Sequence, residues 1–387
     1  MRQDYPRVQV ALCGEQPAVN LILFLETYAW IPLFPINPLT LQKFREAFVT
    51  SRAQDDGQDA RYLAELVLTH SDKLKSWVPE DAQTRRLQQW VLHRRAVVDE
   101  RTALTNRLQA LLKQCFPPAL ELCGEELWRP LATAFLLKWP TLQAVQKAKP
   151  AVLRAFYHVH GSRSQTLIAR RVERIVQAVP LTDETALLDT FALRVELVCR
   201  QLQLVTRAGA DYDRQIAAVF PRHPDRAIFA RLPGAGPVLA PRLLAALGAQ
   251  RERYATAAAL QCFTGLAPVP KQSGGQRVVR RRYRCPLFQR QSFHEYAKER
   301  ILWCRWAAAY YLQQRERGGS HRPAVRARGY KWQRLIWRCW QSHTPYDDAR
   351  YEAALRQRQS PLVALFKRIE GGKNPAKACS QKTLKTR

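Results

Sequence analysis

The chain has 387 residues, 47% of them hydrophobic, and 62 lysines and arginines against 32 aspartates and glutamates, which gives a formal net charge of +30. This length can bury the cores of two or three domains, and the charge favours a partner rich in phosphate, nucleic acid above all. Because the sequence shows neither an apolar run long enough to cross a membrane nor a signal peptide, we expect a cytoplasmic protein with no membrane partner.

Strands and helices alternate in the first part of the sequence, over residues 1–76. Hydrophobic patterns predict a strand that ends at Glu15, a helix over 18–28, a buried strand over 30–37 and a helix whose apolar stripe runs from Leu41 to Phe48. This order favours a mainly parallel or mixed sheet with helices on its faces, an α/β domain. Such sheets keep their sites at the carboxyl ends of strands, so Glu15 is a candidate site carboxylate.

Three aspartates crowd the start of the next predicted helix, at Asp55, Asp56 and Asp59. Helix capping is the simplest interpretation, because a carboxylate accepts hydrogen bonds from the first helical turn. At 100° per residue, however, Asp56 and Asp59 share a stripe with Leu63 and Val67, whereas Asp55 points elsewhere. Carboxylates directed at a core need a partner or a metal ion, so the pattern leaves both capping and a metal site open.

Two long helices are predicted in the middle region, over 77–225. The first runs from about 80 to Cys115, and the second starts after Pro180 with Thr182 as its N-cap. The inward positions of the second helix follow steps of three and four residues: Leu188, Phe191, Val195, Val198, Leu202, Val205, Gly209, Tyr212, Ile216 and Val219. This is a heptad seam typical of a coiled coil, and its partner could be the first helix or a second copy of the chain.

The region 226–365 predicts a mainly helical domain that carries nucleic-acid contacts. A Gly-x-Gly turn at Gly234 and Gly236 opens a helix of small residues, which suits a helix–hairpin–helix whose amides approach a DNA phosphate. Ser273 precedes two glycines, usually the mark of a turn, and a run of basic residues follows it. The run consists of Arg277, Arg280, Arg281, Arg282 and Arg284. Further on, tryptophans alternate with arginines, which indicates an aromatic core with a solvated basic face or, alternatively, a base-stacking surface.

Several segments share their order and spacing with a known family: ALCGEQ, FPINPLTLQKFREAF, SRAQDDGQDA, LPGAGPVLAPRLLAALG, GLAPVPKQSGG, GGSHRPAVRARGYKWQRLIWRCWQ and PYDD. Through them, nearly the whole chain resembles the insertion-sequence-110 family of bacterial transposases, relatives of the Piv DNA invertases. The resemblance implies an N-terminal RuvC-like domain of RNase H-like fold, with an Asp-Glu-Asp-Asp set. It also implies a C-terminal transposase domain with a catalytic serine.

The resemblance assigns roles to individual residues. The family's glutamate falls on Glu15, its last two aspartates on Asp56 and Asp59, and its serine on Ser273. It implies that the three carboxylates hold Mg²⁺ or Mn²⁺ and that Ser273 forms a transient phosphoserine link to DNA. The implied partners are DNA, a structured guide RNA from the element, and further copies of the chain in a dimer or tetramer. The implied location is the bacterial cytoplasm, in association with the nucleoid.

One element of the family pattern is missing from the sequence. The family's first aspartate lies on a strand upstream of the glutamate strand, and no aspartate before Glu15 fits that place, Asp4 included. We therefore expect either a start upstream of Met1 or a truncated copy, and a RuvC-like domain without its first strand.

Two other functions stay open. A metal-dependent nuclease or junction resolvase would need only the carboxylates, and a non-catalytic DNA- or RNA-binding protein would need only the basic elements. We expect a disordered basic tail over 366–387.

Overall fold

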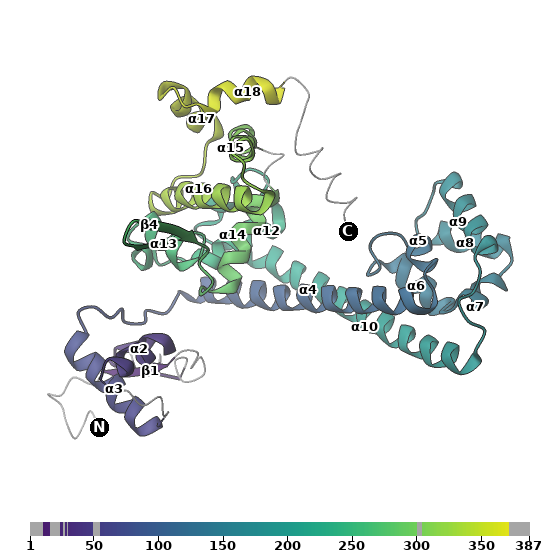
Figure 1. Ribbon diagram of the computed structural model, residues 1–387, viewed down its shortest axis with the longest axis horizontal. Helices are drawn as coiled ribbons and strands as arrows, with labels where there is room; N and C mark the ends of the chain where they lie inside the picture. The colour runs from purple at the N-terminus through teal and green to yellow at the C-terminus, as the bar shows by residue number, and fades with distance from the viewer. Residues whose placement is uncertain are drawn as a thin grey trace. The chain divides into compact units, whose positions relative to one another are not determined.

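The computed structural model describes residues 11–15, 24–25, 28, 30–48, 55–299 and 304–370, and it is mostly helical with a few short strands (Figure 1). The chain divides into two compact units, Met1–Asp81 and Ala82–Arg387. Most of the predicted helix over 18–28, the strand residues before 11 and the tail beyond 370 lie outside the described residues. Within the described ranges, no helix combines the length and the apolar character that crossing a bilayer requires.

The first unit contains a two-stranded parallel sheet and two helices. Strand β1 (Leu12–Glu15) pairs in parallel with β2 (Leu33–Ile36), with Glu15 opposite Ile36, in agreement with the predicted mainly parallel or mixed sheet. Helix α2 (Pro38–Phe48) starts directly after β2, where the Asn37 side chain accepts a hydrogen bond from the Leu39 amide. Helix α3 (Asp56–His70) packs on α2, and Ile36, Leu41 and Leu66 form the small core between these elements.

The buried face of α2 differs from the predicted stripe at its end. Leu41 is buried as expected, but Phe48 is 64% exposed and contributes only a ring contact to Phe44, at 5.1 Å between centroids. The second buried residue of α2 is instead Arg45. Arg45 lies one helical turn after Leu41, on the same face of α2. Its burial is explained by a polar partner on α3.

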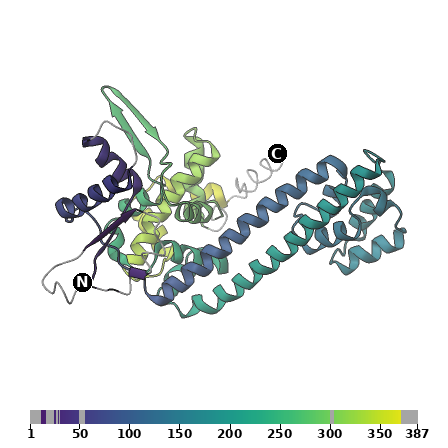
Figure 2. The same cartoon turned by 90° about the horizontal axis from the view of Figure 1, so that it is seen from below.

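Helices α4 (Ala82–Cys115) and α10 (Thr185–Val219) lie side by side along much of their length in the second unit (Figures 1 and 2). They run antiparallel, since Trp90 contacts Tyr212 whereas Leu104 and Leu108 share a core with the first half of α10. The predicted inward positions of α10 are buried or half-buried. The heptad seam therefore packs against the first long helix of the same chain.

Helix α10 begins later than the sequence predicted. Its first residue is Thr185 and its N-cap is Glu184, so the predicted N-cap Thr182 and the residue after it precede the helix. The Thr182 hydroxyl accepts a hydrogen bond from the Glu184 amide, at 3.2 Å. This local side-chain turn competes with helix formation and delays the start of α10.

Two hydrophobic cores lie at different places along the helix pair. One joins the second half of α4 and the first half of α10 to five short helices, as Figure 1 shows. These helices are α5 (Ala119–Cys123), α6 (Pro130–Lys138), α7 (Leu142–Gln146), α8 (Pro150–Val159) and α9 (Gln165–Gln177). Phe135 and Tyr157 are fully buried there, and their rings stack at 6.0 Å.

The other core joins the opposite ends of α4 and α10 to the remaining helices. These are η1 (Phe220–Arg222), α11 (Arg226–Ala230), α12 (Gly236–Leu247), η2 (Arg251–Tyr254), α13 (Ala257–Phe263), α14 (Leu287–Glu299), α15 (Arg305–Glu316), α16 (His321–Gln341), α17 (Asp348–Gln357) and α18 (Leu362–Glu370). Strands β3 (Val269–Ser273) and β4 (Gln276–Arg280) form a hairpin between α13 and α14. Trp306, Trp332 and Trp340 are fully buried in it, which confirms the interpretation as an aromatic core. Because Phe366 also packs into this core, α18 includes residues that the sequence assigned to a disordered tail.

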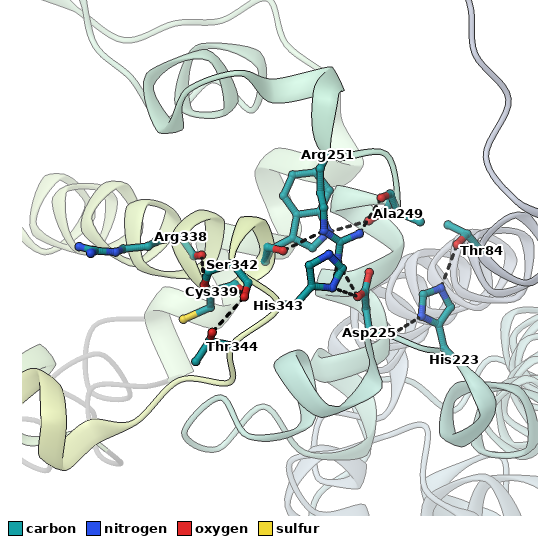
Figure 3. A network of polar contacts seen from close by, with 12 residues as sticks. Thr84, His223, Asp225, Ala249, Arg251, Arg338, Cys339, Ser342, His343 and Thr344 are labelled. Carbon is teal, nitrogen blue, oxygen red and sulfur yellow. Dashed lines mark hydrogen bonds and ion pairs between the residues drawn. The ribbon is translucent and has the colours of Figure 1, made fainter.

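A polar network ties the start of α4 to the end of α16 (Figure 3). His223 Nδ1 accepts from the Asp225 amide at 3.1 Å, so its Nε2 carries the proton and donates to the Thr84 hydroxyl at 2.9 Å. The Asp225 carboxylate accepts from Arg251 at 2.5 Å, and Arg251 also donates to the backbone carbonyl of Trp340 at 3.0 Å. The network therefore fixes elements that are distant in the sequence.

We expect Asp225→Ala to lower the free energy of unfolding by about 3 kcal/mol, because it leaves Arg251 without its buried counter-ion. The Asp225 side chain is only 4% exposed. The matched control is Asp211→Ala, which removes an exposed partner of Arg214 on α10 and should cost less than about 1 kcal/mol. Denaturant unfolding followed by circular dichroism measures both changes. Equal midpoints for the two variants would contradict the role of the network.

Candidate functional site

The carboxylates that the sequence singled out lie at the end of β1 and the start of α3. Glu15 is the last residue of β1, and its side chain lies outside the described residues. Asp55 is the N-cap of α3, where its carboxylate accepts from the Gly57 amide at 3.2 Å. Capping therefore accounts for Asp55, which leaves Asp56 and Asp59 to be explained.

Only one of those two aspartates faces inward. Asp59 is half-buried on the same side of α3 as Leu63, as the helical phase predicted. Asp56, in contrast, is exposed, which corrects the prediction that both carboxylates point at the core. The reason is position: Asp56 is the first residue of the helix, and the described residues of α3 that pack in the core begin one to two turns further along.

Arg45 of α2 is the partner of Asp59. Its Nη1 lies 3.0 Å from Asp59 Oδ1 and 3.3 Å from Oδ2, and its side chain is only 9% exposed. Arg45 was not among the predicted site residues, although its place four residues after Leu41 on the apolar stripe indicated a buried position. One guanidinium group thus contacts both oxygens of Asp59, and a cation bound there would have to share the carboxylate with Arg45.

The oxygen donors of this region suit Mg²⁺ in their chemistry, because hard cations prefer carboxylate ligands. The exposed carboxylate of Asp56 forms no ion pair within the described residues, so it can accept a ligand. Across the part of the chain that the structure describes, no group of three histidine, cysteine or acidic side chains is arranged around a common point. Asp56 and Asp59 can therefore supply two ligands, and a third would have to come from elsewhere.

Ser273 lies at the tip of an antiparallel hairpin formed by β3 and β4. It is the last residue of β3 and pairs with Gln276, so it belongs to a strand and not to the loop that the sequence predicted. The reason is the turn, which needs only two residues because Gly274 adopts a φ of +56°. Glycine at the first central position of a two-residue hairpin is typical of a type II′ turn. Figure 2 shows the two strands as a ribbon that extends beyond the helices of the second unit.

The surroundings of Ser273 are open. The residue is exposed, and side-chain atoms built on Gly274 or Gly275 would meet nothing within 4 Å. Within the described residues, the Ser273 hydroxyl forms no hydrogen bond to a base that could accept its proton. A serine of this kind is accessible to a large substrate but is not activated by its own hairpin.

The arginine run extends from β4 into the segment after it. Arg280, Arg281 and Arg284 are exposed, and Arg281 lies over the ring of Tyr283 at 5.5 Å. Arg282 is half-buried, with one nitrogen 3.8 Å from the sulfur of Cys262. The side chain of Arg277 lies outside the described residues. The run therefore presents at least three cations to a ligand.

Further cationic and titratable side chains lie near this run. His294 of α14 faces Arg326 and Arg281, and burial, followed by these two charges, lowers the pKa of its imidazole. Burial and, after it, the charge of Arg281 also lower the pKa of the Arg326 guanidinium. These shifts indicate a surface where positive charge accumulates, which suits a phosphate ligand.

The predicted glycine turn separates α11 from α12. Gly234 and Gly236 have φ values of +61° and +58°, a conformation that favours glycine, and α12 begins at Gly236 as expected. A shallow depression beside the turn is lined by Glu295, Lys298 and Glu299. Because the charge beside the turn is mixed, contact between these amides and a DNA phosphate stays a prediction.

Comparisons with known proteins identify the family. A family model described as a transposase, with DEDD and IS110 in its name, matches residues 2–117, and one described as the transposase IS116/IS110/IS902 family matches residues 226–312. The candidate transposase of the IS117 mini-circle from Streptomyces coelicolor is 28% identical over 332 residues, 84% of this chain and 80% of that protein. An uncharacterized IS116 protein of Streptomyces clavuligerus is 29% identical over 70% of this chain and 67% of its own length. The chain therefore belongs to the IS116/IS110/IS902 family of transposases.

Proposed function

We propose that this protein moves its insertion sequence by DNA strand exchange, with Ser273 as the nucleophile. The observation that carries the proposal is the placement of Ser273 at an exposed hairpin tip beside two glycines, with exposed arginines on the same hairpin and just after it. The lack of side chains around the tip leaves room for a phosphodiester to approach the hydroxyl. Arg280, at the opposite end of β4 from the tip, and Arg281 after it can hold neighbouring phosphates of the same DNA strand.

The proposed reaction conserves the energy of the phosphodiester bond. The Ser273 oxygen loses its proton and bonds to phosphorus while the bond from phosphorus to one sugar oxygen of the DNA strand breaks, and the freed sugar oxygen takes a proton. The resulting phosphoserine diester is then attacked by a sugar hydroxyl of a second strand, which releases Ser273. A direct hydrolysis would lose this bond, so the covalent step separates a recombinase from a nuclease.

The first unit is proposed to supply the activation that the hairpin lacks. We propose an RNase H-like fold for it, supported by the parallel β1–β2 pair and the helices that follow. Glu15, Asp56 and Asp59 are the proposed ligands of Mg²⁺ or Mn²⁺, which supplies Lewis-acid polarisation of a phosphate and a lower pKa for the attacking hydroxyl. Arg45 would hold Asp59 in position through one oxygen while the other is released to the ligand.

We expect Asp56→Asn to weaken Mn²⁺ binding by the full chain about tenfold or more, because a carboxylate ligand is lost. The matched control is Asp55→Asn, which removes the same charge one residue earlier while asparagine keeps the helix cap. Electron paramagnetic resonance of free Mn²⁺ in a titration measures both affinities. If Asp55→Asn and Asp56→Asn weakened binding equally, the effect would be general charge and Asp56 would not be a ligand.

The partners follow from the same proposal. DNA is the partner class of a transposase, and the net charge of +30 supports a large phosphate-rich surface. We propose that a structured guide RNA from the element selects the DNA and that the active assembly is a dimer or tetramer. The exposed apolar side chains of Val176, Val179 and Leu181 support contact with a further chain.

A further inference from the structure

A groove lies along α16 on the side of α17. It consists of two adjoining cavities with volumes of about 890 and 570 Å³, which share four lining residues: Leu335, Arg338, Tyr351 and Arg358. We call this surface the α16–α17 groove. All of its lining residues belong to the second unit, so its geometry does not depend on the placement of the first unit.

Positive charge dominates the α16–α17 groove. Its lining includes six basic side chains: Arg231, Lys331, Arg334, Arg338, Arg350 and Arg358. Within the described residues, none of the six forms an ion pair with a carboxylate. The two acids of the groove are engaged locally, since Asp347 caps α17 through the Arg350 amide at 3.0 Å and Asp348 accepts from the Tyr346 hydroxyl at 2.8 Å.

Lys331 is a half-buried cation of the groove that packs against aromatic rings. Its ammonium group is half-buried and lies 4.7 Å from the ring centre of Tyr310 and 5.1 Å from that of Trp306, where the ring faces attract a cation. Burial, with a contribution from Arg334, lowers the pKa of Lys331 to about 8. Six cations without acidic partners repel one another, and an anionic ligand would remove this repulsion.

Aromatic rings form part of the wall beside these cations. Trp337 and Tyr351 are half-buried and line the groove, whereas Trp306, Trp332 and Trp340 are fully buried in the core. The Trp337 ring is fixed, because its Nε1 donates to the Tyr254 carbonyl at 2.9 Å. Fixed aromatic rings beside unpaired basic residues are typical of surfaces that bind single-stranded nucleic acid.

We propose that the α16–α17 groove binds the sugar–phosphate backbone of a single-stranded nucleic acid, with the arginines at its phosphates and Trp337 and Tyr351 at its bases. A concave groove admits a flexible strand, whereas the convex surface of a duplex reaches only the rim. The proposal extends the function above and does not involve Ser273 or the carboxylates. It can therefore be tested by binding alone, without strand exchange.

The test compares two double variants of the full chain. Arg334→Glu/Arg338→Glu reverses two exposed charges in the groove, and Arg194→Glu/Arg207→Glu makes the same charge change on the exposed face of α10. The probes are fluorescein-labelled oligo-dT and oligo-U of about 20 nucleotides and a duplex of equal length. Fluorescence anisotropy measures the affinity of each variant for each probe at several salt concentrations. Melting temperatures confirm that both variants fold.

The groove variant is expected to bind single strands about tenfold more weakly than the α10 variant. The logarithm of its binding constant should also fall less steeply with the logarithm of the salt concentration, by about 1.4 in slope, which corresponds to two phosphate contacts. Both variants should bind the duplex equally. Loss with oligo-dT alone identifies a DNA strand as the occupant, and loss with oligo-U, alone or with oligo-dT, identifies RNA as an occupant. A milder variant, Arg334→Gln/Arg338→Gln, should show an intermediate loss on the same probes.

Two results would overturn the proposal. Equal losses for the groove and α10 variants on all probes would mean that the groove contributes only general charge. A loss on the duplex as large as that on single strands would mean that the groove rim binds duplex DNA and that the concave wall is not used.

Discussion

Ser273→Ala is expected to abolish DNA strand exchange, with a loss of about 10³-fold or more, while the fold and the affinity for DNA stay unchanged. The substitution removes one oxygen from an exposed strand end and no charge, so it disturbs neither packing nor phosphate attraction. The expected loss is large because no other group at the hairpin tip can form the same covalent link. Recombination between two element ends in vitro measures the rate.

The matched control for this variant is Ser320→Ala. Ser320 is also exposed and also adjoins two glycines, Gly318 and Gly319, and its side chain makes no capping hydrogen bond to α16. The control should recombine at the normal rate. If Ser273→Ala recombined as fast as Ser320→Ala, the chemistry would belong to another residue, and a metal-dependent nuclease or resolvase would become the better account.

Leu202→Asp is expected to lower the free energy of unfolding by about 4 kcal/mol or more. Leu202 is fully buried in the seam between α10 and α4, so the change removes a packed side chain and buries an unpaired carboxylate. The mass of the protein in solution should not change, because the partner helix of this seam belongs to the same chain. Denaturant unfolding and light scattering measure the two quantities.

Leu204→Asp is the control for the seam, since Leu204 lies two residues further along α10 and is 70% exposed. We expect it to change the free energy of unfolding by about 0.5 kcal/mol or less, as surface substitutions do. Similar denaturation midpoints for Leu202→Asp and Leu204→Asp would contradict the packing of α10 on α4.

Elements with a strong local signal could be predicted from the sequence. The three-four spacing of α10 identified its buried face from Phe191 to Ile216, because a long amphipathic helix repeats the same signal many times. The turn at Gly234 and Gly236 was also predictable, since few other residues adopt a positive φ. The order of strands and helices predicted a mainly parallel or mixed sheet, and β1 and β2 pair in parallel.

Features that depend on contacts between elements could not be predicted in this way. The exposure of Asp56 depends on where along α3 the packing against α2 ends, which the periodicity of the sequence does not specify. Arg45 has a charged side chain on an apolar stripe, and only the position of Asp59 on the neighbouring helix explains its burial. The α16–α17 groove combines Arg231 with residues more than 100 positions further along the chain, so no local pattern indicates it.

The covalent link at Ser273 is the central claim, and peptide mapping of a trapped protein–DNA adduct tests it most directly. The full chain is incubated with labelled element-end DNA, guide RNA and Mg²⁺, denatured, and digested with trypsin for mass spectrometry. The account predicts a nucleotide-bearing peptide modified at Ser273, present in the Ser320→Ala control and absent from Ser273→Ala. Cleaved DNA without any adduct, no reaction of the unaltered chain, or an adduct that maps to another residue would contradict it.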